Sequence, residues 1–250
     1  MSDALENINA QIAAARANAG AVIQQAADAP TPPAVGQGFQ PPAASNAVQP
    51  GRPVSLGELL AQGGMRVDVY LKADKTGFLL GTDAKNPQEE LEVEFKLSDV
   101  VPFFGLRWGS TPAKYLRSFD RLTESRTKKP WADCVAEAMR SDDRCRGDYA
   151  SADIPFTYIG EDVVAAKGEA GKVLLAKGQS LGLTLSITNF KEFASFIKPY
   201  DDLKAAGQIP ADLMLRGKLV HKEATGGGNV YGKANFVDFI AVSRSAVDEG

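Results

Sequence analysis

The stretch "LEVEFKLSDV" (residues 91–100) alternates apolar and polar side chains over most of its length. Successive side chains of an extended chain point to opposite faces, so its leucine, valine and phenylalanine side chains share one face. The preceding runs "MRVDVYLKA" (65–73) and "TGFLLGTD" (76–83) have a similar pattern. Three such runs in succession predict an antiparallel meander with one face on the core and the other in solvent.

Further strands and two helices are expected after this meander. The runs "PFFGLRWG" (102–109) and "AKYLRSFDRL" (113–122) fit strands, although the spacing of the second also fits a helix and leaves both interpretations open. One helix is predicted within "KPWADCVAEAMRSDDRCRG" (129–147), because Pro130 suits a first turn and apolar residues recur at intervals of three and four. A second helix is predicted over about residues 189–200.

The remaining C-terminal sequence is also typical of strands. The runs "IPFTYI" (154–159) and "KVLLAKGQSLGLTLSIT" (172–188) precede the second helix, and two alternating runs within residues 213–242 follow it. Between these two runs, "TGGGN" (225–229) supplies the glycines that a tight turn requires. We therefore predict a β-hairpin at this point rather than a phosphate-binding loop.

The first part of the chain differs in composition from the rest. Residues 3–27 have the spacing of a short, weakly amphipathic helix, and residues 29–53 are rich in proline, which favours a flexible linker. We predict a disordered, Ala/Pro-rich arm over residues 1–53 and one β-rich globular domain over residues 54–250. The expected fold class is β-rich α+β: an OB-like antiparallel β-barrel or sandwich with two inserted helices, preceded by a disordered N-terminal arm.

Little in the sequence indicates catalysis. The chain has 250 residues but only one histidine, His221, and two cysteines, Cys134 and Cys145, which are too few ligands for a structural zinc site. No nucleophile elbow, phosphate-binding loop, dinucleotide-binding fingerprint or paired-histidine metal motif is present. We expect no enzyme activity and no cofactor, although a metal-assisted mechanism built on aspartates stays open as a third alternative.

Cations and aromatic residues are concentrated between residues 107 and 131, although the formal net charge of the chain is −3. Cations can pair with phosphates while aromatic rings stack on bases, which predicts a surface for single-stranded nucleic acid. The candidate binding residues here are Arg107, Trp108, Lys114, Tyr115, Arg117, Phe119, Arg121, Arg126, Lys128 and Lys129. Alternatively, the aromatic side chains belong to the core and the cations solubilise the opposite face; the spacing of Trp131 fits this alternative.

The predicted C-terminal hairpin carries a second set of candidate binding residues. They are Arg216, Lys218, Lys222, Tyr231 and Lys233. Hairpins of this kind clamp single strands in OB-type barrels, so this set supports the same kind of surface.

In this organisation the chain resembles the single-stranded DNA-binding proteins of phage or plasmid type. The resemblance covers roughly residues 54–242 and rests on the predicted β-core, the low-complexity appendage and aromatic residues such as Trp108, Tyr115, Phe119 and Tyr231. It implies an OB-fold that binds single-stranded DNA, or RNA, without sequence specificity, in support of DNA replication or recombination.

The sequence also bears on location and partners. The first twenty residues lack the basic and apolar regions of a signal peptide, and no run reaches the roughly 18 apolar residues of a membrane span. We expect a cytoplasmic protein with no membrane partner, and a homo-oligomer is an open alternative. The competing hypothesis is a structural or assembly protein of a virion, which would need a β-rich body, a flexible arm and no catalytic residues.

Overall fold

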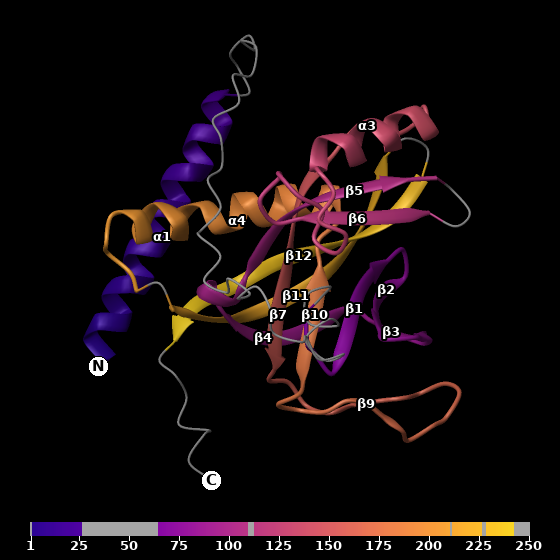
Figure 1. The fold of residues 1–250 in the computed structure, drawn as a ribbon. Coiled ribbons are helices and arrows are strands. Elements are labelled where there is room, and N and C mark those ends of the chain that lie inside the picture. Colours follow the sequence, from indigo (N-terminus) through magenta and orange to yellow (C-terminus); the bar gives the residue numbers. More distant parts are fainter. Residues whose placement is uncertain (1, 27–64, 110–112, 211, 227–228, 243–250) are drawn as a thin grey trace, which may run out of the picture.

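The computed structural model describes residues 2–26, 65–109, 113–210, 212–226 and 229–242, which form three α-helices, one short 3₁₀ helix and twelve strands (Figure 1). The helices are α1 (Ser2–Ala26), α3 (Trp131–Ser141) and α4 (Ile187–Ala205), and the 3₁₀ helix is η1 (Leu97–Asp99). The strands are β1 (Val69–Asp74), β2 (Gly77–Leu80), β3 (Asp83–Gln88), β4 (Glu90–Lys96), β5 (Val101–Trp108), β6 (Lys114–Ser118), β7 (Tyr149–Tyr158), β8 (Val163–Val164), β9 (Val173–Leu175), β10 (Ser180–Thr184), β11 (Met214–Gly226) and β12 (Asn229–Val242).

Most of the expected elements are present. The two inserted helices are confirmed as α3 and α4, and the C-terminal hairpin is confirmed as β11 and β12. The run "AKYLRSFDRL" forms strand β6, so its helical alternative is wrong. The predicted linker over residues 29–53 lies outside the described residues.

Strand β7 is the central strand of the main sheet. The first half of β7 pairs with β5 and its last two residues pair with β4, whereas β10 pairs along its opposite edge. The order through the sheet is β12-β11-β4-β7-β10-β1-β2-β3, with the β5–β6 hairpin attached to β7. Strands β8 and β9 form a separate ladder.

The main sheet is mixed and curled, which corrects two parts of the expected fold. Strand β1 pairs with β10 in parallel, with Val69 opposite Leu181, so the sheet is not wholly antiparallel. The curl brings Gly232 of β12 against the end of β1, where the ring Nε2 of His221 hydrogen-bonds to the carbonyl oxygen of Asp74 at 2.7 Å. Among the described strands no ladder joins β1 to β12, so this approach does not close a barrel.

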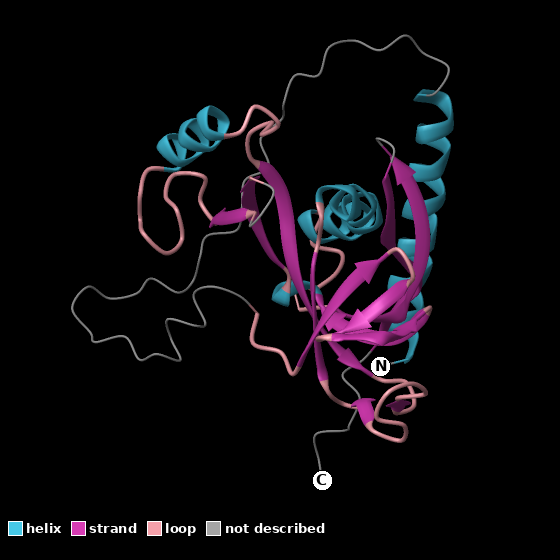
Figure 2. Ribbon diagram, turned by 90° about the vertical axis from the view of Figure 1, so that its right-hand side faces the viewer, coloured by secondary structure: helices cyan, strands magenta, loops and turns pink. Residues whose placement is uncertain are grey.

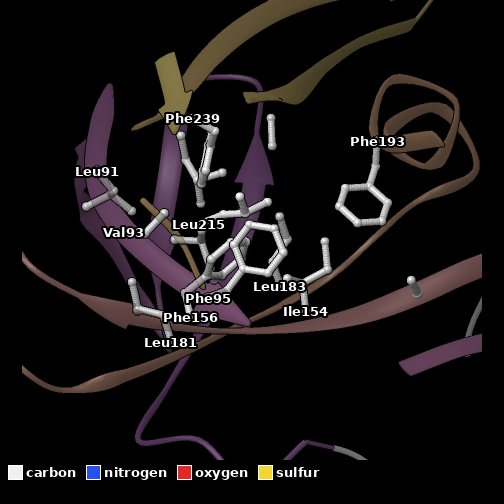
Figure 3. Close-up of a cluster of buried hydrophobic side chains, with 14 of the residues drawn as sticks. Leu91, Val93, Phe95, Ile154, Phe156, Leu181, Leu183, Phe193, Leu215 and Phe239 are labelled. Carbon is white, nitrogen blue, oxygen red and sulfur yellow. The ribbon is translucent and has the colours of Figure 1, made fainter. Parts of the chain in front are cut away.

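Helix α4 lies in the concave face of the curled sheet. Figure 2 shows the helix end-on, with strands on both sides of it. The helix begins after Ser186, whose side-chain oxygen accepts a hydrogen bond from the backbone N–H of Asn189, as is typical of an N-cap. Its buried Phe193 belongs to the same core as the strand residues Phe95 and Phe239 (Figure 3). The rings of Phe95 and Phe239 meet edge to face, with 5.7 Å between their centroids.

Helix α1 confirms the helix predicted over residues 3–27, and it packs on the body of the protein instead of belonging to a disordered arm. Ile12 is 2% exposed and belongs to the main core. The side-chain amide of Asn9 pairs with the backbone of Ala241 in β12: Nδ2 donates to the Ala241 oxygen at 3.1 Å, and the Ala241 N–H donates to Oδ1 at 2.7 Å. The guanidinium of Arg16 lies 5.2 Å from the ring centre of Tyr200, and burial raises the pKa of this tyrosine to about 12. None of the helices in the described part of the chain is long and apolar enough to cross a membrane.

Candidate nucleic-acid interface

The period-two geometry of β5 and β6 sends the predicted binding residues to two different faces. In the β5–β6 ladder Arg107 stands opposite Tyr115, whereas Trp108 stands opposite Lys114. Because adjacent residues of a strand point to opposite faces, Arg107 and Tyr115 share one face with Arg117, and Trp108 and Lys114 share the other. The single stretch of sequence therefore supplies two surfaces with different surroundings.

The face that carries Trp108 packs against α3. Trp108 and Trp131 are 8% and 2% exposed and belong to one buried cluster with Leu106 and Cys134. The indole N–H of Trp131 donates a hydrogen bond to Asp148 at 2.9 Å. This bond gives the buried indole nitrogen the partner that it would otherwise lack. Trp131 is a core residue, as its helical spacing indicated. Trp108 was predicted to stack on bases, but its burial leaves only a small part of its ring accessible.

The opposite face of β5 and β6 forms the floor of a groove of about 1090 Å³. The first residues of β7, which pair with β5, extend this floor, and the walls come from the segment between α3 and β7 and from the start of α4. The lining residues are Phe103, Gly105, Arg107, Trp108, Gly109, Tyr115, Leu116, Arg117, Asp142, Arg144, Cys145, Arg146, Gly147, Asp148, Tyr149, Ser151 and Thr184 to Thr188. We call this hollow the arginine–tyrosine groove.

Two tyrosines dominate the floor of the arginine–tyrosine groove. Tyr115 is 62% exposed. Tyr149 lies opposite Gly105 in the β5–β7 ladder, and a Cβ on Gly105 would come within 2.7 Å of the Tyr149 ring. The absence of a side chain at Gly105 therefore lets this ring lie across β5. Burial is the main cause that raises the pKa of Tyr149, and the nearby Tyr115 is the second. The phenol of Tyr149 is therefore neutral at physiological pH.

Four arginines and two aspartates give the arginine–tyrosine groove a positive balance. The Arg117 guanidinium pairs with the buried Asp153 at 2.5 Å, and Arg144 pairs with Asp142 at 3.1 Å. The Arg107 guanidinium lies 5.6 Å from the centre of the Tyr115 ring. Arg146 is exposed and, within the described ranges, makes no ion pair. Arg107 and Arg146 are thus the cations of this groove best placed to meet a phosphate.

The turn between β6 and α3 is built around two carboxylates. Burial alone would raise the pKa of Asp120, but hydrogen bonds from the backbone N–H groups of Thr123 and Leu122 and from the hydroxyls of Ser118 and Thr123 outweigh it and lower the pKa to about 2. Glu124, which is 1% exposed, is arranged in the same way and also has a lowered pKa. These carboxylates fix the backbone of the turn.

The Asp120 turn should make stability depend on pH. Because the folded-state pKa is about 2, below the ordinary 3.8, the carboxylate contributes stability that is complete above about pH 4 and is lost as the pH falls toward 2. We expect Asp120→Asn to be less stable than the unaltered chain at pH 7, with a difference that shrinks between pH 4 and 2. Urea unfolding across this range measures it.

Asp143→Asn, at an exposed aspartate outside the turn, controls for the loss of a surface charge. A stability difference between Asp120→Asn and the unaltered chain that stays constant down to pH 2 would contradict this account of the turn.

The remaining predicted residues of this region lie outside the lining of the arginine–tyrosine groove. Arg121 pairs with Asp148 at 2.9 Å, and its guanidinium lies 5.0 Å from the centre of the Phe104 ring. Phe119 is 37% exposed on the same turn. Arg126, Lys128 and Lys129 are exposed. The structure thus brings only part of the predicted cluster together in one groove.

The hairpin candidates are not part of this groove either, because none of its lining residues comes from β11 or β12. Figure 2 shows the β11–β12 hairpin and the β5–β6 hairpin on different sides of α4. Three hairpin cations pair with glutamates: Arg216 with Glu94, Lys218 with Glu90, and Lys233 with Glu192 of α4. Lys222 is exposed and Tyr231 is half-buried.

Tyr149, Arg144 and Arg146 were not among the predicted binding residues, because they lie well beyond the cationic stretch in the sequence. Their only local signal is the clustering of arginines in "RCRGDY" (144–149). No protein-family model, curated protein or solved structure matches the chain. Within the described ranges, no three His, Cys, Asp or Glu residues are grouped so that they could hold a metal ion.

Proposed function

We propose that this protein binds single-stranded nucleic acid, DNA in the first place, in the arginine–tyrosine groove. The observation that carries the proposal is the combination of two tyrosine rings on the floor with Arg107 and Arg146 beside them. Rings of this kind stack on bases of any identity, and arginines pair with the phosphates between them. The binding is therefore non-specific in sequence, as replication or recombination in the cytoplasm requires.

A single strand fits this arrangement better than a duplex. Bases in a duplex are already stacked on each other and cannot reach a ring on the floor of a groove without being flipped out. The net charge of −3 does not oppose binding, because the ligand meets the local charge of the groove rather than the total. We also propose that the fold is OB-like, in the sense that a curled β-sheet carries the face that binds single-stranded nucleic acid.

The first experiment is a fluorescence titration with a labelled single strand of about thirty nucleotides and the matching duplex. Measured at about 50 and about 200 mM salt, the affinity for the single strand should exceed that for the duplex and fall steeply as salt rises. Absence of binding at micromolar protein would overturn the proposal and favour a structural or assembly role for the chain.

Arg146→Ala should weaken binding through charge alone. Each phosphate contact with a single strand contributes about 0.7 to the slope of log affinity against log salt, so we expect the variant to lose about 0.7 from that slope. Arg140→Ala, at an exposed arginine of α3 outside the groove lining, is the matched control and should leave the slope unchanged. Equal slopes for Arg146→Ala and the unaltered chain would remove Arg146 from the interface.

A further inference from the structure

A second, smaller hollow lies between β6 and α3. It has a volume of about 370 Å³, within the range of pockets that hold a small ligand. Its lining residues are Trp108, Lys114, Tyr115, Leu116, Thr127, Lys129, Cys134 and Glu137. The proposed function gives this hollow no role, although four of the predicted binding residues line it: Trp108, Lys114, Tyr115 and Lys129.

The second hollow adjoins the arginine–tyrosine groove across strand β6. Trp108, Tyr115 and Leu116 line both. Strand β6 is an edge strand in the described part of the sheet, because it pairs only with β5. The turn that follows β6 hydrogen-bonds back to it at Arg117, where the Ser125 N–H donates to the backbone oxygen at 2.8 Å. The other end of β6, at Tyr115, is the place where a ligand can pass over the strand.

The chemistry of the second hollow suits one nucleotide. Its lining carries two lysines and one carboxylate, Glu137. The Lys114 ammonium lies 5.7 Å from the centre of the Trp108 ring. Lys129 is exposed and makes no ion pair with another described residue. Two cations can hold a phosphate, and the apolar lining residues Leu116 and Trp108 can contact a base.

We propose that a single strand bound in the arginine–tyrosine groove crosses the edge of β6 at Tyr115 and places its next nucleotide in the second hollow. This inference rests on the proposed function and specifies the path and extent of the ligand on that site. Tyr115, whose side chain is 62% exposed, lies at this crossing point and lines both hollows, so it contacts the bound nucleic acid in each of them.

The test is the dependence of affinity on strand length. Oligothymidylates of about 4, 8, 12 and 16 nucleotides, the range of sites on a single small domain, are titrated against the unaltered chain, Lys129→Ala and Arg146→Ala. For the shortest oligonucleotide that binds measurably, we expect Lys129→Ala and the unaltered chain to have the same affinity. For the longest, Lys129→Ala should bind several-fold more weakly, with a salt slope smaller by about 0.7. Arg146→Ala should lose affinity at every length.

Lys177→Ala, at an exposed lysine between β9 and β10 that lines neither hollow, is the control and should match the unaltered chain throughout. The inference is overturned if Lys129→Ala has no effect at any length, or the same fractional effect at all lengths, while the unaltered chain binds. Failure of the unaltered chain to bind any of the oligonucleotides overturns the proposed function, and this inference with it.

Discussion

Tyr115→Ala is expected to weaken binding of a single strand by about 5- to 150-fold, the range that corresponds to about 1–3 kcal/mol for one base stacked on an aromatic ring. The effect should be large because Tyr115 lies on the floor of the arginine–tyrosine groove and also lines the second hollow. Its high exposure means that removing the ring creates no core cavity, so the variant should fold as the unaltered chain does. Equilibrium titration at fixed salt measures the change.

Two further variants sharpen this test. Tyr115→Phe keeps the ring and should retain most of the affinity. Tyr70→Ala removes another exposed tyrosine, on β1, which lines neither hollow, and should bind normally. The salt slope should be unchanged in Tyr115→Ala, because stacking releases no counterions. A small loss that Tyr70→Ala reproduces would show that Tyr115 does not contact the bases.

Gly232→Ala is expected to lower the free energy of unfolding by about 1–3 kcal/mol, and by more if the backbone cannot adjust. A Cβ at this position would lie 2.0 Å from the backbone oxygen of Asp74 and 2.8 Å from Nε2 of His221. Since a backbone oxygen cannot rotate away as a side chain can, β12 or the end of β1 must move. Chemical denaturation of the variant, compared with that of the unaltered chain, gives the difference.

Val230→Ala is the matched control for this substitution, because it lies on the same strand and is 48% exposed. Its effect should stay within about 0.5 kcal/mol. If Gly232→Ala proves as stable as Val230→Ala, the close approach of β12 to β1 is not a fixed feature of the folded protein, and the sheet is more open than described.

The elements of this fold follow from local patterns, but their arrangement does not. Alternation predicts β4 because it depends only on neighbouring residues, whereas the spacing of the β6 run left strand and helix both open. The parallel pairing of Val69 with Leu181 joins residues far apart in the chain, and nothing in either run specifies its partner. The same reason explains why the curl of the sheet, with Gly232 against Asp74, was not foreseen.

The candidate site was predicted in part, for a similar reason. Arg107 and Tyr115 were identified because cations and aromatic residues cluster within one stretch of sequence. Tyr149 joins them only through the β5–β7 ladder, which places it opposite Gly105. Whether Trp108 lies in the core was left open by the sequence, since an alternating strand can send a tryptophan to either face and only α3 shows which face is covered.

Charge counts along the sequence also overestimated the number of available cations. Lys218 and Arg216 stand on β11 beside the glutamates of β4, to which they are joined across the ladder. Such cross-strand pairs are formed between residues more than a hundred positions apart, so a local count treats each cation as unpaired. The structure assigns these lysine and arginine side chains to the sheet surface.

The pairing of Asn9 with Ala241 has a consequence for how the chain folds. The two residues are 232 positions apart, and the loop that joins them must close before either hydrogen bond can form. Helix α1 is therefore expected to dock late, after β12 has joined the sheet, even though it is synthesised first. Until then the outer edge of β12 has no cover, and an uncovered strand edge can pair with another unfinished chain. The side-chain amide of Asn9, by fixing α1 on Ala241, is therefore expected to shield this edge of β12 once folding is complete.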